Sequence, residues 1–140
     1  MRKRFILKSV CIVFLVFNLQ SCSAPEDPKL VTTKILLQKI WLLKNVTIDG
    51  VQSDLYSGLS IDFSENSFTS TKGGALWPSF GQWKFGDSEG KVIVRNDGLE
   101  ISIESITSES FIISFLWTKT TLSGRGKSLS GLHKMVFRPN

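Results

Sequence analysis

The sequence predicts an all-β fold: an eight-stranded antiparallel up-and-down barrel preceded by a short N-terminal helix. Three observations support this prediction. The 140 residues suit one domain, since single domains have on the order of 100–200 residues. From Lys39 onward apolar and polar side chains alternate with period two, and breaks recur every ~8–12 residues, which is typical of sandwiches and barrels. Most of these breaks are tight turns, which leave no room for the long crossovers that parallel strands need.

The N-terminal segment has the pattern of a secretory signal. Four basic residues lie within the first eight positions, and an almost uninterrupted apolar run covers residues 9–17. A basic head, an apolar run of about 7–15 residues and small residues before a cleavage site define such a signal. The run is much shorter than the ~20 residues of a membrane-spanning helix. We therefore expect residues 1–21 to be a signal peptide that is removed.

A possible site of lipid attachment follows directly. The tetrapeptide Leu19-Gln20-Ser21-Cys22 resembles the lipobox of bacterial lipoproteins. This resemblance implies that Cys22 receives a diacylglycerol and an N-terminal acyl chain, and that residues 22–32 are the lipidated cysteine and a flexible tether. Three acyl chains bind a membrane far more firmly than one chain does. Ser23 after the cysteine resembles the outer-membrane sorting context of Gram-negative lipoproteins. The expected location is the outer membrane, lipid-anchored on its periplasmic face or at the cell surface.

Removal of this segment changes the charge and the cysteine content. The chain has 17 Lys+Arg and 12 Asp+Glu, for a net charge of +5, but removing four basic residues from 17 leaves 13 against 12 acidic ones. Nucleic-acid binding needs clustered, uncompensated cations, so we expect no nucleic-acid partner. The two cysteines are Cys11 and Cys22. Processing and lipidation would leave neither a free thiol nor a disulfide, which excludes thiol chemistry.

The remaining elements follow in order. Residues 23–29 form a linker with two prolines, and Thr32 or Thr33 is expected to cap a short helix that continues to Leu37. The barrel domain is expected to span residues 33–140. Asp97-Gly98, between two alternating runs, is a strong hairpin signal. The predicted strands cover residues 40–48, 59–64, 67–71, 81–86, 91–95, 99–106, 111–118 and 131–138.

Alternation along these strands places one apolar face of each toward the barrel centre. Eight strands enclose an interior that side chains fill or that holds one small ligand. The chain has 10 Phe, 4 Trp and 1 Tyr, and two interpretations of these aromatic residues stay open: an ordinary filled core, or a dry cavity lined by aromatic rings. In the second interpretation the ligand contacts Phe63, Trp83, Phe85, Phe111, Phe115 and Trp117.

Several segments resemble the small lipocalin-like (calycin-type) domains of bacterial lipoproteins. They are the short helix, Trp41 near the start of the first strand, the F-x-x-N-x-F pattern that begins at Phe63, and the W-P-S-F-G-Q-W-K-F run that begins at Trp77. The resemblance implies a barrel that binds a small, largely apolar molecule. It also implies that a late arginine, here Arg138, stacks on Trp41 and closes one end of the barrel. Lys39 stands where lipocalins carry a glycine.

Trp77 is distinct from the other aromatic residues, because Trp77-Pro78 lies outside the predicted strands, close to Gly73-Gly74. We expect an exposed tryptophan in a loop, suited to act as a lid or to contact carbohydrate or another protein.

The sequence predicts a binding protein and no enzyme. His133 is the only histidine, and alternation places it in the barrel or on its wall, so we expect no catalytic residues, no metal ligands and no cofactor. Glu100 and Glu104 share one strand face at ~13 Å, whereas paired glycosidase carboxylates lie ~5–9.5 Å apart. The leading hypothesis is a membrane-anchored lipocalin-like lipoprotein that binds a small hydrophobic ligand. The alternative is an envelope module with a filled core that docks a protein or carbohydrate, either as a homodimer or with an envelope partner.

Overall fold

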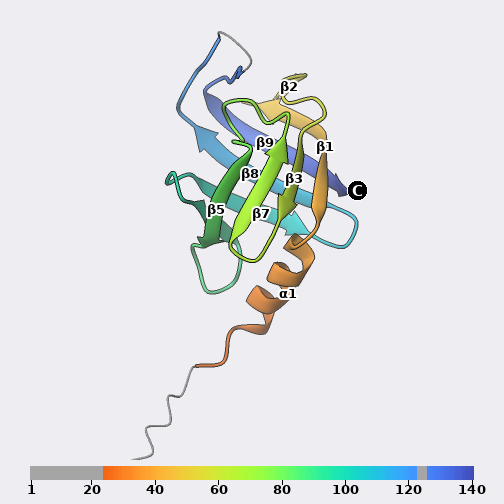
Figure 1. The fold of residues 1–140 in the computed structure, drawn as a ribbon, viewed down its shortest axis with the longest axis vertical. Coiled ribbons are helices and arrows are strands. Elements are labelled where there is room, and N and C mark those ends of the chain that lie inside the picture. The colour runs from red at the N-terminus through yellow and green to blue at the C-terminus, as the bar shows by residue number, and fades with distance from the viewer. Residues whose placement is uncertain (1–23, 123–125) are drawn as a thin grey trace, which may run out of the picture.

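The structure, a computed structural model, describes residues 24–122 and 126–140, and it confirms an all-β barrel with one short helix (Figure 1). The described residues form one helix and nine strands, and neighbouring strands are antiparallel. In chain order the elements are α1 (Pro28–Leu37), β1 (Ile40–Ile48), β2 (Val51–Ser53), β3 (Ser60–Phe63), β4 (Ser67–Thr71), β5 (Phe80–Phe85), β6 (Val92–Arg95), β7 (Glu100–Ile106), β8 (Phe111–Trp117) and β9 (Gly131–Pro139).

The first long strand closes the barrel. β1 pairs with β9 along nearly its whole length. On its other edge β1 pairs with two short strands, because residues 40–42 face β3 and residues 46–48 face β2. β2 and β3 therefore share one position around the barrel, so the nine strands occupy the eight positions that the sequence predicts. Closure removes the open sheet edge that would otherwise pair with other chains.

β2 is the one strand of the structure that the sequence analysis does not contain. Ile48 pairs with Val51, so Asp49 and Gly50 alone form the loop, with φ of 50° and 81°. Positive φ at both central residues is the type I′ geometry that two-residue hairpins favour. The Asp49-Gly50 pair, which follows the first predicted strand, is thus a true hairpin turn.

Helix α1 begins four residues before the predicted cap. Asp27 is the N-cap and its carboxylate accepts a hydrogen bond from the Lys29 amide at 2.8 Å, while Pro28 occupies the first helical position. Asp at the cap and Pro at the first position both suit a helix start. The prediction that Thr32 or Thr33 is the cap is wrong: the Thr32 hydroxyl instead donates to the Pro28 carbonyl at 2.9 Å.

The two ends of the barrel differ. At the helix end, α1 lies against the turns at 64–66 and 86–91 and contacts β7 (Figure 1), with Leu37 buried beneath it. Lys34 pairs with Glu65 at 3.3 Å and ties the helix to the first of these turns. At the opposite end, called the loop end here, the connections at 54–59, 72–79 and 96–99 lie beside the described parts of the connection between β8 and β9.

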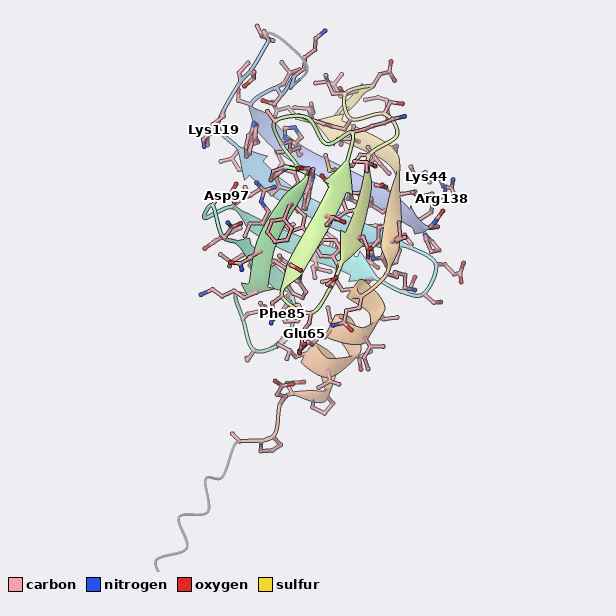
Figure 2. All side chains as sticks on the ribbon, viewed as in Figure 1. Lys44, Glu65, Phe85, Asp97, Lys119 and Arg138 are labelled. Carbon is pink, nitrogen blue, oxygen red and sulfur yellow. The ribbon has the colours of Figure 1, made fainter. Side chains whose placement is uncertain are left out.

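Inward-facing side chains from all strands but β2 share the barrel interior with residues of α1 and the loops. β8 follows the predicted alternation, because Phe111, Ile113, Phe115 and Trp117 are buried while Leu116 is 62% exposed. Charged side chains such as Lys44, Glu65 and Arg138 project from the outer surface (Figure 2). Each buried large apolar side chain contributes ~1.5–3 kcal/mol.

Candidate functional site

Five of the six aromatic residues that the sequence assigns to a ligand cavity are buried in the interior, and Phe85 is half-buried. Their rings contact one another. Phe63 lies edge-on to Trp83 at 5.8 Å and to Phe111 at 6.0 Å between ring centroids. Edge-to-face pairs at ~4.5–7 Å are the arrangement that packed aromatic residues favour. Around Phe63, therefore, the rings occupy the interior themselves.

Trp41 lies at the helix end. It is fully buried, its ring lies 5.2 Å from that of Phe111, and its indole nitrogen donates to the Leu37 carbonyl at 3.2 Å. Trp41 thus joins the end of α1 to the core.

The predicted contact between Arg138 and Trp41 is wrong. Arg138 is exposed and lies opposite Leu42. Since successive strand residues point to opposite faces, its side chain is on the outer face, whereas Trp41 points inward. Lys39 supplies the cation instead, with its Nζ 5.1 Å from the centroid of the Trp41 ring.

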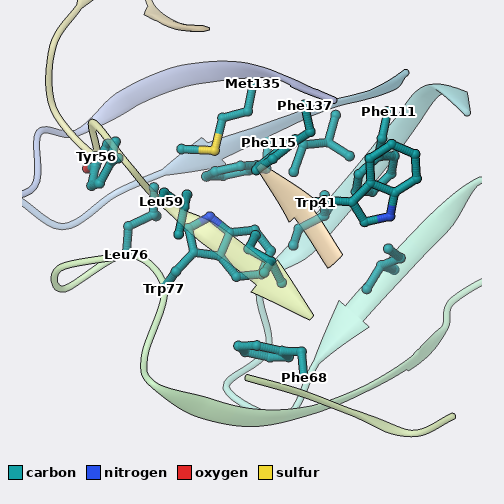
Figure 3. Packing of buried hydrophobic residues seen from close by; sticks show 14 of the residues in the cluster. Trp41, Tyr56, Leu59, Phe68, Leu76, Trp77, Phe111, Phe115, Met135 and Phe137 are labelled. Carbon is teal, nitrogen blue, oxygen red and sulfur yellow. The ribbon is translucent and has the colours of Figure 1, made fainter. Parts of the chain in front are cut away.

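The loop between β4 and β5, residues 72–79, turns into the barrel (Figure 3). We call it the plug loop. Leu76 and Trp77 are 0% and 1% exposed, so the prediction of an exposed Trp77 is wrong. The reason is a close return of the backbone: a Cβ on Gly73 would clash with the Trp77 carbonyl, and the Trp77 amide donates to the Gly73 carbonyl at 3.0 Å.

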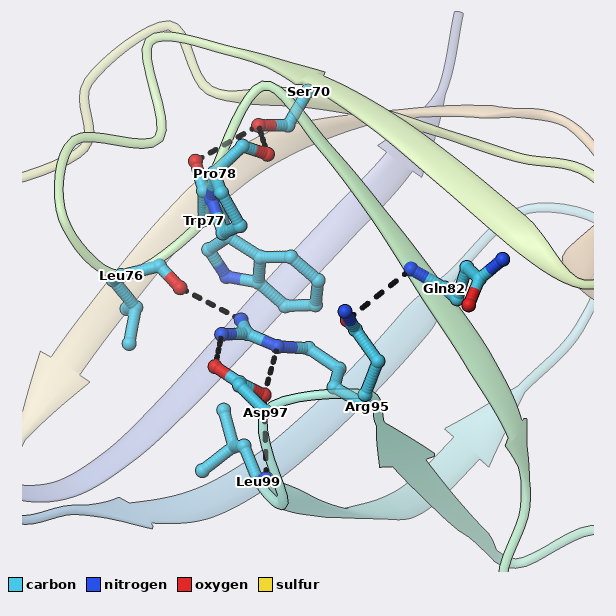
Figure 4. A network of polar contacts seen from close by, with 9 residues as sticks. Ser70, Leu76, Trp77, Pro78, Gln82, Arg95, Asp97 and Leu99 are labelled. Carbon is cyan, nitrogen blue, oxygen red and sulfur yellow. Dashed lines mark hydrogen bonds and ion pairs between the residues drawn. The ribbon is translucent and has the colours of Figure 1, made fainter.

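A buried arginine holds the plug loop, and sequence reasoning missed it. Arg95, at the end of β6, is 3% exposed. Its Nη1 donates to the Leu76 carbonyl at 2.7 Å, and its guanidinium carbon lies 5.1 Å from the Trp77 ring centroid (Figure 4). Asp97 balances the charge through Nε at 3.1 Å and through a second contact to Nη2. Alternation in β6 places Arg95 on the same face as buried Ile93, and this was the available signal.

The ion pair also determines the protonation of Asp97. Burial by itself would raise the pKa of this carboxyl, but the hydrogen bond and positive charge of Arg95 outweigh it, so the pKa is lower than usual. Asp97 is therefore ionised at neutral pH. On the other side of the plug loop, the Ser70 hydroxyl contacts the carbonyls of Trp77 and Pro78 at 2.9 and 2.8 Å.

Four buried polar atoms in the loop-end half have no hydrogen-bond partner among the described residues. They are the Tyr56 hydroxyl, the indole nitrogens of Trp77 and Trp117, and Nε2 of His133. Ring contacts connect three of these residues through Phe115: Tyr56 lies 6.0 Å from His133, His133 stacks on Phe115 at 5.3 Å, and Phe115 lies 6.5 Å from Trp77. Trp117 is two residues farther along β8 on the same face. We call Tyr56, Trp77, Trp117 and His133 the loop-end polar cluster.

The cluster is uncharged at neutral pH. Nδ1 of His133 lies 3.1 Å from the Gly131 carbonyl, which only accepts, so Nδ1 carries the proton and Nε2 is left as an acceptor. Burial lowers the pKa of His133, opposed by the Gly131 carbonyl and Asp49. Burial likewise raises the pKa of the Tyr56 phenol, opposed by the nearby backbone of Leu129, which approaches the hydroxyl without reaching hydrogen-bond geometry. Indole nitrogens only donate, so the cluster offers two obligate donors, one acceptor and one hydroxyl.

A surface hollow of ≈ 420 Å³ lies outside this cluster and the start of the plug loop. Its volume is within the ~300–1,000 Å³ of small-molecule pockets. The lining residues are Asp54, Leu55, Tyr56, Ser57, Lys72, Gly74 and Lys127. Tyr56 therefore separates the hollow from His133 in the interior.

The outer face of β8 and β9 is apolar near the loop end. Leu116 and Leu132 are cross-strand partners and are 62% and 53% exposed. Both residues line a second hollow, of ≈ 560 Å³, along the outside of the barrel.

Comparison of the chain with models of protein families, with curated proteins and with solved structures gave no match. Cys22 and the predicted signal peptide lie outside the described residues. Within residues 24–122 and 126–140, no helix has the length and apolar character needed to cross a membrane, and no three His, Cys, Asp or Glu side chains are grouped for metal binding.

Proposed function

We propose that this chain is a membrane-anchored, lipocalin-like lipoprotein whose barrel binds a small, largely apolar molecule without converting it. One observation carries the proposal: the four polar atoms of the loop-end polar cluster are buried without a partner among the described residues. Roughly 90% or more of buried polar groups in proteins are hydrogen-bonded. Four such atoms in one half of one small barrel support a partner from outside the described residues.

The donors and acceptor of the cluster specify the chemistry of that partner. Both indole nitrogens need an acceptor, and Nε2 of His133 needs a donor. Because the cluster is neutral and an unpaired buried charge is strongly unfavourable, the complementary group on the ligand is uncharged. The ring of Phe115, which contacts both His133 and Trp77, favours an apolar body.

Binding is tested on the full chain, purified from its own host and kept in lipid nanodiscs. Native mass spectrometry is expected to release one co-purifying small molecule at up to one equivalent, with an apolar body and an uncharged polar group. The matched control is a variant with His133→Phe and Tyr56→Phe, which keeps the rings and should lose the molecule. If preparations of the unchanged chain contain only lipids that empty nanodiscs also release, the proposal is wrong.

Membrane anchoring rests on the sequence pattern around Cys22 and needs its own test. Cells fed radiolabelled palmitate are expected to label the unchanged chain and not the Cys22→Ser variant. The labelled protein should fractionate with the outer membrane. Equal labelling of both proteins, or an unlabelled chain that keeps residues 1–21, would remove the lipoprotein assignment.

One observation favours the alternative function, an envelope interaction module that acts as a homodimer or with an envelope partner. Leu116 and Leu132 form an exposed apolar pair on the outer face, and exposed apolar surface often marks contact sites. Sedimentation velocity tests the homodimer: self-association that Leu116→Lys abolishes would support it, and a monomer at every concentration would count against it.

A further inference from the structure

Trp77 occupies the interior of the barrel although a loop carries it. Its ring lies 5.4 Å from that of Phe68 and 6.4 Å from that of Phe63, both nearly perpendicular. The other tryptophans, Trp41, Trp83 and Trp117, belong to strands. Trp77 is therefore the tryptophan that can leave the interior without breaking a strand.

The indole of Trp77 is well packed in this position, but its N–H lacks a hydrogen bond among the described residues. Trp41 and Trp83 both donate their ring N–H to backbone carbonyls, whereas the N–H of Trp77 is buried without a partner among the described residues. Figure 3 shows this ring between Leu59 and Phe68, with its nitrogen on the side of Leu59. The ring thus has good apolar contacts and an unsatisfied polar edge.

Buried apolar contacts of Leu76 and Trp77 hold the plug loop together with a small number of polar contacts. Arg95 donates to the Leu76 carbonyl, and Ser70 contacts the Trp77 and Pro78 carbonyls (Figure 4). Gly73 and Gly74 follow Lys72 at the start of the loop, and Gly74 has a φ of 61°, which suits a hinge. The hollow beside Gly74 and Lys72 lies at the same hinge.

Together these features point to a barrel that is closed by its own side chain. We propose that Trp77 occupies the ligand site, and that the ligand displaces the plug loop and takes the place of the indole, so that the Trp77 N–H gains water and the ligand meets the remaining atoms of the loop-end polar cluster. This rests on the proposed function of the barrel. The ligand is then a flat aromatic molecule of roughly bicyclic size. The ligand also carries a carbonyl group. The oxygen of this group accepts the hydrogen bond that the Arg95 guanidinium donates to the Leu76 carbonyl in the closed barrel, and Asp97 already balances the charge of Arg95.

Indole-3-carbaldehyde and 3-methylindole form a matched pair of probes, because only the first has a carbonyl oxygen. The unchanged full chain, labelled with 5-fluorotryptophan and kept in nanodiscs, is titrated with each and followed by fluorine NMR. The Trp77 resonance is assigned by its loss in Trp77→Phe. When the aldehyde binds, the chemical shift of the Trp77 resonance is expected to change to that of a solvent-exposed indole. The chemical shift of Trp41, at the helix end, should not change. The affinity for 3-methylindole should be about tenfold lower, since it offers Arg95 no acceptor.

A second variant separates plugging from ordinary core packing. Ser70→Ala removes a restraint on the plug loop without touching its ring, so more molecules have an open loop and the aldehyde should bind several-fold more tightly. Ser60→Ala is the control, because Ser60 bonds the Thr71 hydroxyl at 2.6 Å on the outer face. A merely structural role for Ser70 predicts lower stability and no gain in affinity.

The possible failures are distinguishable. Binding that leaves the Trp77 resonance and the hydrogen exchange of residues 72–79 unchanged overturns the plug and leaves the proposed function intact. Equal affinity for both probes overturns the assignment of Arg95 as the donor. Absence of binding at millimolar concentration overturns the assigned ligand class, while the mass-spectrometric experiment decides the proposed function separately.

Discussion

Replacing Arg95 with methionine removes the group that connects the β6–β7 turn to the plug loop. The substitution keeps a long, unbranched side chain in the same space, so the cavity it leaves is small. It removes the hydrogen bond to the Leu76 carbonyl, the stacking on Trp77 and the ion pair with Asp97. The effect on stability therefore reports on these polar contacts more than on packing.

The structure allows the magnitude to be worked out. A hydrogen bond from a charged donor contributes ~1.5–3 kcal/mol, and a desolvated cation–π contact adds ~0.5–2 kcal/mol. The side chain of Asp97 is 42% exposed and regains water, so the loss of its partner adds little. Arg95→Met also removes the unfavourable desolvation of the buried guanidinium, and this reduces the net loss of stability. The expected loss is about 2–4 kcal/mol in the free energy of unfolding.

Urea denaturation followed by circular dichroism measures this loss. Arg138→Met is the matched control, because Arg138 is exposed and such substitutions change stability by ~0.5 kcal/mol or less. Hydrogen exchange of residues 72–79 should rise in Arg95→Met before the barrel strands exchange. If Arg95→Met lies within about 1 kcal/mol of the unchanged protein, the buried arginine does not hold the plug loop and the reasoning is refuted.

Three further predictions concern pH, the plug-loop hinge and the helix cap. Burial lowers the pKa of His133 in the folded protein below its usual value. The stability that the neutral imidazole contributes to the folded state is therefore complete above pH ~6.5 and is lost as the pH falls toward the folded pKa. The melting temperature should drop between pH 7 and 5, and it should drop less in His133→Phe. Gly73→Ala should cost more stability in urea denaturation than Gly98→Ala, because its Cβ clashes with the Trp77 backbone, while that of Gly98 meets nothing within 4 Å and costs only the backbone strain of a φ of 86°. Asp27→Ala should lower the melting temperature through the loss of ~1 kcal/mol.

Strand positions were predictable because alternation and turn residues agree along most of the chain. β1 and β4 have the predicted bounds, and the other predicted strands differ at their ends. β2 was not predicted, because its three residues are mostly exposed and show no alternation of apolar and polar side chains. The helix start was misplaced because several residues here can cap, and only the structure shows that Asp27 does so.

The site was less predictable, because it depends on contacts between distant segments. The sequence identified most of the buried aromatic residues but assigned Trp77 to the surface, since loops are usually exposed. The return of the plug loop depends on Gly73, and its retention depends on Arg95 from another strand. Similarly, nothing in the sequence indicates that Lys39, and not Arg138, lies against Trp41.

A crystal structure of the chain purified from its own host tests the central claim most directly. We expect density for one small organic molecule in the loop-end half, hydrogen-bonded to Nε2 of His133 or to the indole N–H of Trp117, with Trp77 moved out of the interior. A closed plug loop, with ordered water on each atom of the loop-end polar cluster and no other molecule inside, would contradict the claim that this barrel binds a ligand.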